Sequence, residues 1–159
     1  MRRMAAALAV VGALQFSAGS ACANWDDGVA AAQRGDFATA FQEGLPLAEQ
    51  GDASAQGAIG ALYENGMGVP QNYYEAVKWY RMAAEQGFAE AQYNFGVMYA
   101  NGEGVPTNFV KAYMWISLAK AEGEKNASAN LDIVKTLMTP AQIAKAQELA
   151  DEWWEEHND

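Results

Sequence analysis

Two consecutive stretches of the sequence, residues 55–90 and residues 91–126, repeat each other at a period of 36 residues. The first reads AQGAIGALYENGMGVPQNYYEAVKWYRMAAEQGFAE, and the second reads AQYNFGVMYANGEGVPTNFVKAYMWISLAKAEGEKN. They align without a gap, and the matched positions include glycines, prolines and tryptophans: Gly60 with Gly96, Gly68-Val69-Pro70 with Gly104-Val105-Pro106, and Trp79 with Trp115. Self-similarity at a fixed period of this length is typical of proteins that stack one structural unit.

Each unit is predicted to form two antiparallel helices. Apolar residues of the first helix recur at the spacing of one helical face, at Ala55, Ala58, Ile59, Leu62 and Tyr63. Asn65-Gly66 ends this helix, because glycine readily takes the left-handed conformation that a helix C-terminus needs. The Gly-rich loop that follows cannot continue as helix, and Asn72 is placed to cap the second helix, which Gly87 closes.

Small and large residues alternate within the unit. Gly60 and Gly96 fall inside predicted helices, where each costs about 1 kcal/mol relative to alanine. That cost predicts close approach by a neighbouring helix. We expect most of the aromatic side chains around these glycines to lie in the core, although a binding box is the alternative: Tyr63, Trp79, Tyr80, Tyr99 and Trp115.

The pattern A-x-x-x-x-G-x-x-Y-x-x-G-x-G-V-P-x-N-x-x-x-A-x-x-W-x-x-x-A resembles the Sel-one-like repeat (SLR), a relative of the tetratricopeptide repeat. Two full units cover about half the chain. The family often has Asp where Asn72 and Asn108 stand, but either residue can cap a helix. The resemblance implies an all-α fold, a right-handed α-α superhelix (solenoid) of stacked antiparallel helix pairs. It also implies an interaction scaffold, without naming a partner.

The flanks extend the predicted solenoid on both sides. Phe37–Gln50 resembles the second helix of an earlier unit, with Trp25–Arg34 as its first helix and Pro46 as a kink or interruption. Beyond the repeats, Ala127–Leu137 is predicted as one helix. Thr139, Pro140 and Gln142 then form the start of a last helix that runs to about Glu155. The predicted divisions are a helix pair at 24–51, repeats at 52–87 and 88–123, and capping helices at 124–159.

The N-terminal segment, residues 1–23, is predicted to be a cleaved secretory signal. Arg2 and Arg3 precede an apolar run over residues 5–16, which is too short to span a bilayer, and Ala21-Cys22-Ala23 has the form that signal peptidase accepts. We therefore expect an exported bacterial protein, periplasmic or secreted, with no transmembrane segment in the mature chain. Lipidation of Cys22 is the alternative.

Charge and composition restrict the possible functions. Removing Arg2 and Arg3 leaves 8 of the 10 basic residues against 20 acidic ones, so the mature formal charge is 8 − 20 = −12. Such a charge disfavours nucleic acid as a partner and is compatible with a basic protein. His157 is the single histidine and Cys22 the single cysteine, so the sequence predicts no metal site, no cofactor, no catalytic residues and no enzyme activity.

The predicted function is therefore protein or peptide binding on the concave face that the first helices line. Counting from Gly60 places these residues on that face: Ser54, Gly57, Ala61, Glu64, Asn65, Glu90, Tyr93, Val97, Ala100 and Asn101. Tyr93 is the expected anchor, and Tyr93→Ala is expected to weaken binding without unfolding the protein. A glycan or peptidoglycan binder that uses Tyr74, Tyr113 and Trp154 is the alternative, and an enzyme or enzyme subunit is the third reading.

Overall fold

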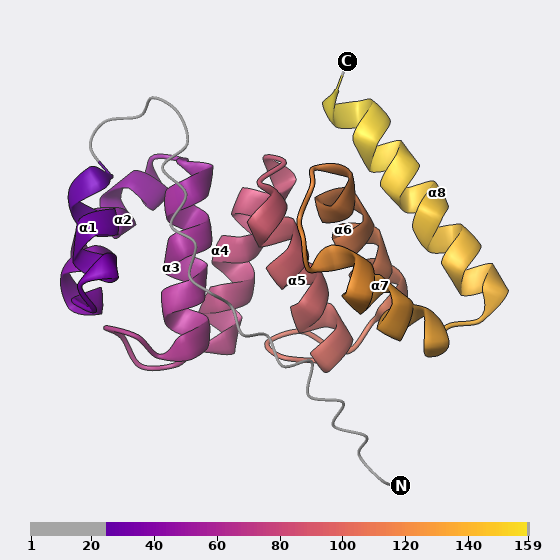
Figure 1. The fold of residues 1–159 in the computed structure, drawn as a ribbon, viewed down its shortest axis with the longest axis horizontal. Helices are drawn as coiled ribbons and strands as arrows, with labels where there is room; N and C mark the ends of the chain where they lie inside the picture. The colour runs from indigo at the N-terminus through magenta and orange to yellow at the C-terminus, as the bar shows by residue number, and fades with distance from the viewer. Residues whose placement is uncertain (1–24, 159) are drawn as a thin grey trace, which may run out of the picture.

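The computed structural model describes residues 25–158, and these residues form eight helices and no strand (Figure 1). The helices follow one another in the order α1 (Asp26–Gln33), α2 (Phe37–Glu49), α3 (Ala53–Asn65), α4 (Tyr73–Glu85), α5 (Ala89–Asn101), α6 (Phe109–Ala121), α7 (Ala127–Thr136) and α8 (Pro140–His157). The predicted signal sequence, its cleavage site and Cys22 lie outside the described residues.

From α1 to α7, helices that are neighbours in the chain are also neighbours in space. The pairs α1–α2, α3–α4 and α5–α6 form hairpins, and contacts of α2 with α3 and of α4 with α5 stack one hairpin on the next (Figure 1). At the C-terminal end, α6 contacts both α7 and α8. This arrangement is the all-α solenoid that the sequence predicts, and the prediction is confirmed.

Local sequence signals set the ends of the helices. Gly66 has a φ of 63° and ends α3, while the side chain of Asn72 accepts hydrogen bonds from the amides of Tyr74 and Glu75 at the start of α4. Thr139 and Gln142 form the predicted capping box of α8. Pro46 does not interrupt α2, contrary to one of the two outcomes expected for it. Proline removes only one amide donor, and the Pro46 carbonyl still accepts from the amide of Gln50.

Close helix contacts occur at both of the predicted glycines. A Cβ atom added to Gly60 would lie 2.8 Å from Cδ1 of Tyr80, and one added to Gly96 would lie 2.6 Å from Cγ1 of Ile116. The α4 and α6 side chains therefore reach across these glycines into the core. Four of the five aromatic residues predicted for the core are buried (Trp79, Tyr80, Tyr99 and Trp115), and Tyr63 is half-buried.

The second glycine of each Gly-Val-Pro loop lies against the preceding unit. Gly104 has a φ of +69°, and a Cβ atom there would collide with the backbone carbonyl of Tyr73 at the start of α4. A Cβ atom on Gly68 would likewise collide with the backbone carbonyl of Phe37, which lies 36 residues before Tyr73. The two loops thus join adjacent hairpins at equivalent places.

We expect Gly104→Ala to lower the free energy of unfolding by about 2 kcal/mol or more, because it combines left-handed strain with a backbone collision. Gly123→Ala is the matched control. Gly123 also has a positive φ, +91°, but a Cβ there meets nothing within 4 Å. We therefore expect Gly123→Ala to lower the free energy of unfolding by only about 1 kcal/mol, from backbone strain alone. Urea denaturation measures both, and equal losses would contradict the inter-unit contact.

Candidate functional site

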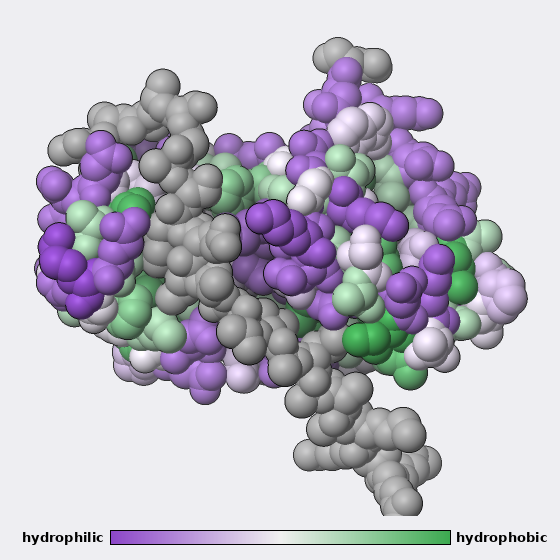
Figure 2. All heavy atoms as spheres, viewed as in Figure 1, coloured by the Kyte–Doolittle hydropathy of each residue, from purple (hydrophilic) through white to green (hydrophobic). Residues whose placement is uncertain are grey.

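Four half-buried carboxylates gather on the surface formed by the first helices of the hairpins. Glu64 lies on α3, Glu90 on α5, Glu103 in the α5–α6 loop and Glu124 in the loop before α7. Glu64 interacts electrostatically with Glu103, and Glu90 with Glu124. We call these four residues the carboxylate cluster. Figure 2 shows hydrophilic side chains in the middle of this face, between α3 and α7.

Glu64 is held in place from the neighbouring helix. The ring of Tyr80 on α4 passes over Gly60, and its hydroxyl donates to Oε2 of Glu64 at 2.6 Å. Burial raises the pKa of Glu64, the bond from Tyr80 lowers it in part, and the charge of Glu103 raises it further. Tyr80 is itself buried, and burial raises the pKa of its hydroxyl well above the ordinary value.

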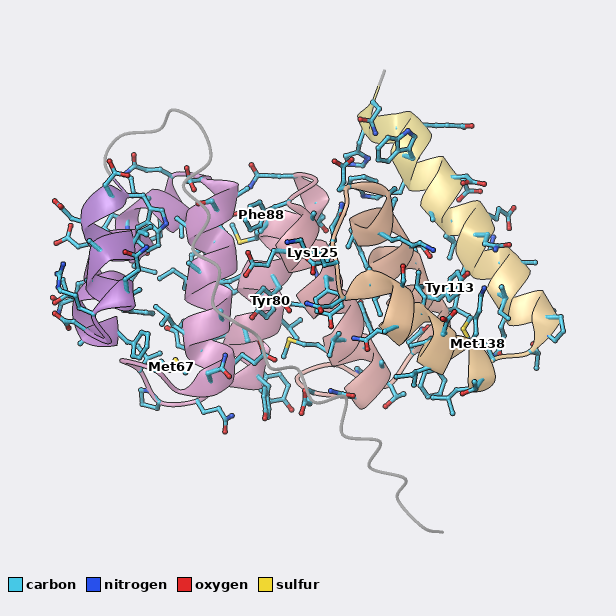
Figure 3. The ribbon with its side chains drawn as sticks, in the orientation of Figure 1. Met67, Tyr80, Phe88, Tyr113, Lys125 and Met138 are labelled. Atoms are coloured by element: carbon cyan, nitrogen blue, oxygen red, sulfur yellow. The ribbon has the colours of Figure 1, made fainter. Side chains whose placement is uncertain are left out.

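Glu90 lies in the first turn of α5 without a hydrogen-bond or ion-pair partner among residues 25–158. Burial raises its pKa from 4.5 to about 7, and the charge of Glu124 adds to the effect. The salt bridges of the described chain lie elsewhere, joining Lys78 to Glu75 and Lys145 to Glu148. Lys125 lies on this face in Figure 3 but forms no salt bridge with the carboxylate cluster.

The residues that the sequence placed on the concave face separate into three groups by exposure. Asn65 and Asn101 are exposed, and Ser54, Glu64, Glu90 and Ala100 are half-buried. The remaining four are buried, so their expected exposure was wrong: Gly57, Ala61, Tyr93 and Val97. The face therefore offers Asn and Glu side chains rather than the predicted tyrosine.

Tyr93 and Gly57 are covered by segments that follow them in the chain. The hydroxyl of Tyr93, a residue only 6% exposed, accepts a hydrogen bond of 2.6 Å from Nδ2 of Asn130 on α7. A Cβ on Gly57 would lie 2.8 Å from Cε1 of Phe88, whose ring thus lies over the glycine. Tyr93 joins α5 to α7, and its replacement by alanine would remove core packing, contrary to the expectation of an intact fold.

Sequence reasoning missed Phe88, Glu103, Glu124 and Tyr80 as contributors to this face. Phe88 and Glu124 occupy equivalent positions, 36 residues apart, directly after the glycine that closes a second helix. Their shared position was a usable signal. Figure 3 shows Phe88, Tyr80 and Lys125 together in the middle of the face. Glu103 gave no such signal, because Met67 stands at its place in the first unit.

The aromatic residues proposed for glycan binding do not all reach the surface. Tyr74 is 78% exposed and Trp154 is 39% exposed, but Tyr113 is 5% exposed and belongs to the core. The assignment of Tyr113 to a binding surface was therefore wrong, because α6 packs between α5 and the two last helices. Within residues 25–158, no group of three or more His, Cys, Asp and Glu side chains is placed to hold a metal ion.

Hairpins that contact only their neighbours define the class of α-solenoid repeat proteins. The Sel1 repeat matches residues 53–88 and 89–124, and the chain is therefore a Sel1-like repeat (SLR) protein. Proteins with these repeats are generally protein-interaction scaffolds and are typically non-catalytic. No helix among the described residues has the length and apolar character needed to cross a membrane.

Solved structures of other repeat proteins share this fold. A protective antigen of uropathogenic Escherichia coli that displays an SLR fold superposes with a TM-score of 0.79, at 26% identity over 84% of this chain and 29% of its own. A Sel1 repeat protein from Oxalobacter formigenes gives a TM-score of 0.67, at 29% identity over 82% of this chain and 56% of its own. The chain thus spans a minor part of the first and about half of the second. No curated protein matches the sequence.

Proposed function

We propose that this SLR protein is a non-catalytic, exported adaptor of the bacterial envelope, periplasmic or secreted, that binds a basic segment of a partner protein on the face carrying the carboxylate cluster. The observation that carries the proposal is the state of Glu90: it is largely removed from water and no cation of residues 25–158 neutralises it. The proposal that the protein is exported rests on the signal-like sequence of residues 1–23.

A lysine or arginine of the partner would neutralise the charge of these half-buried carboxylates. Carboxylates that are already desolvated have lost part of their hydration, so a cation that approaches them gains more than it would at an exposed pair. The bond from Tyr80 holds Glu64 in one position, which reduces the ordering that a partner must impose on it. The formal charge of −12 for the chain without residues 1–23 further favours encounter with a basic partner.

In-cell crosslinking tests the location of the partner. A photoreactive residue at Asn101, exposed on this face, should capture a partner, whereas one at Gln147, exposed on α8, should not. We expect Glu64→Gln with Glu90→Gln to reduce capture about tenfold or more, and Glu155→Gln, on the exposed end of α8, to leave it unchanged. Capture that is equal from Asn101 and Gln147, or insensitive to the double substitution, would reject the face.

Crosslinking from Asn101, combined with a cell-wall binding assay, distinguishes glycan binding from protein binding. Tyr74 and Trp154 are exposed, which is the observation in its favour. Retention of the protein on purified cell-wall sacculi that is lost in Trp154→Ala, together with no protein captured from Asn101, would assign the function to glycan binding instead.

A further inference from the structure

The helix α7 exposes two aliphatic side chains at the C-terminal end of the layer of first helices. Ile133 is 41% exposed, and Leu137, the residue that caps the end of α7, is 49% exposed. They are the only exposed isoleucine or leucine residues among residues 25–158. Because they are four residues apart, they lie next to each other on one side of α7.

The equivalent position in the preceding unit is buried. Val97 of α5 lies 36 residues before Ile133 and is 2% exposed. One turn before Val97, the hydroxyl of Tyr93 accepts a hydrogen bond from Asn130, so α7 lies along this side of α5. Within residues 25–158 no further first helix follows α7, and α8 packs on α6 (Figure 1). The side of α7 that carries Ile133 therefore stays open.

The open side of α7 is only partly polar. Terminal units of a solenoid need a polar outer face. Asp132 meets that need, since it is exposed at the position that Gly96 has in α5, and Thr136 is exposed as well. Ile133 and Leu137 do not. Adjoining apolar side chains with polar neighbours are typical of a surface that contacts another protein.

The two aliphatic side chains lie beside the carboxylate cluster. Leu137 is equivalent to Asn101 of α5, and Asn101 donates a hydrogen bond of 3.3 Å to Glu103, a member of that cluster. Packed helices lie about 10 Å apart, so Leu137 is about one helix spacing from Glu103. Figure 2 shows hydrophobic side chains over α7, next to the hydrophilic middle of the face. One polypeptide segment that crosses the first helices can therefore contact both.

We propose that the basic segment bound on this face is extended and carries a large apolar side chain, about three residues from a lysine or arginine, that packs on Ile133 and Leu137. An extended chain rises about 3.3 Å per residue, so about three residues cover the spacing from Glu103 to Leu137. The carboxylates attract the cation, and the apolar contact fixes the register of the segment.

The exposed asparagines of the face favour an extended segment over a helical one. Asn65 and Asn101 are exposed, and a side-chain amide both donates and accepts hydrogen bonds. An extended segment offers free backbone N–H and C=O groups to such amides, whereas a helix pairs most of its own. This inference rests on the function proposed above, because it gives the chemistry of the same partner.

Selection of a displayed library of random ten-residue peptides on the purified protein tests the proposal. We expect enriched peptides to contain lysine or arginine with leucine, isoleucine, phenylalanine or methionine about three residues away. Selection on a protein with Ile133→Ser and Leu137→Ser should keep the basic position and lose the apolar one. Met82→Ser is the matched control: Met82 is 37% exposed on α4, a second helix, and its replacement should leave both positions.

The affinity of one enriched peptide, measured by fluorescence anisotropy, then isolates the apolar contact. Leu137→Ser should weaken binding about tenfold, and serine in place of the apolar residue of the peptide should do the same. If the two side chains contact each other, both changes together should still weaken binding by only about tenfold. A hundredfold loss for the combination would show that they act separately and would overturn the inference.

The outcomes distinguish this inference from the proposed function. Enriched peptides with basic residues and no apolar preference would overturn the inference and leave binding of a basic segment in place. No enrichment, enrichment without basic residues, or enrichment that Glu64→Gln with Glu90→Gln does not change would reject the proposed function, and this inference with it.

Discussion

Replacing Trp115 with alanine is expected to lower the free energy of unfolding by about 3–5 kcal/mol, the usual loss for a large aromatic side chain removed from a core. Trp115 is 8% exposed on α6. Its ring centroid lies 5.3 Å from that of Phe95 on α5 and 5.9 Å from that of Trp153 on α8. The truncation would thus leave a cavity where the second repeat meets the last helix.

Urea denaturation followed by circular dichroism measures this loss. Trp154→Ala provides the control, because Trp154 is the next residue after Trp153 on α8 yet is 39% exposed, and we expect it to change stability by less than about 1 kcal/mol. Similar losses for the two substitutions would show that Trp115 does not join α6 to α8. A loss confined to Trp115→Ala would support α8 as an integral part of the solenoid.

The helices and their ends were predictable because local and periodic signals determine them. Asn72 and Asn108 cap α4 and α6 through their own side chains, and Gly66 and Gly102 end α3 and α5 in the left-handed conformation. A cap involves residues within a few positions of one another, so the sequence contains all of its determinants. The close approach at Gly60 followed from the cost of glycine inside a helix.

The composition of the binding face was less predictable, because burial there depends on segments outside the unit. Position along α5 suggested that Tyr93 faces solvent, but Asn130 of α7 covers and bonds it. Gly57 is likewise covered by Phe88, which lies in the loop after α4. A helical stripe counted within one repeat gives the direction of a side chain and does not show whether the next repeat lies across it.

The electrostatic features also arise from tertiary contacts. Glu103 and Glu124 lie in loops, and only the folded chain places them near Glu64 and Glu90. The exposure of Ile133 is a tertiary feature too. Its counterpart 36 residues earlier is buried, and Ile133 is exposed only because no further first helix follows α7 within residues 25–158.

The second large effect that we expect is a pH dependence of stability. It arises at Glu90, whose pKa in the folded protein is about 7 rather than 4.5. Between these values the folded state keeps a proton that the unfolded state has released, so stability falls as the pH rises from about 4.5 to 7. The shift corresponds to a loss of up to about 3 kcal/mol above pH 7. We therefore expect Glu90→Gln to stabilise the protein by about 2–3 kcal/mol at pH 8 and hardly at all at pH 4.

Urea denaturation of both proteins at pH 4 and pH 8 measures the difference, and Glu155→Gln, which removes an exposed carboxylate, should show no pH-dependent gain. A stabilisation by Glu90→Gln that is the same at both pH values would contradict a raised pKa. The instability of charged Glu90 also bears on binding. A cation that neutralises this carboxylate lowers its pKa and releases the proton, so a basic partner should bind more tightly as the pH rises from 5 to 8, and Glu90→Gln should remove that dependence.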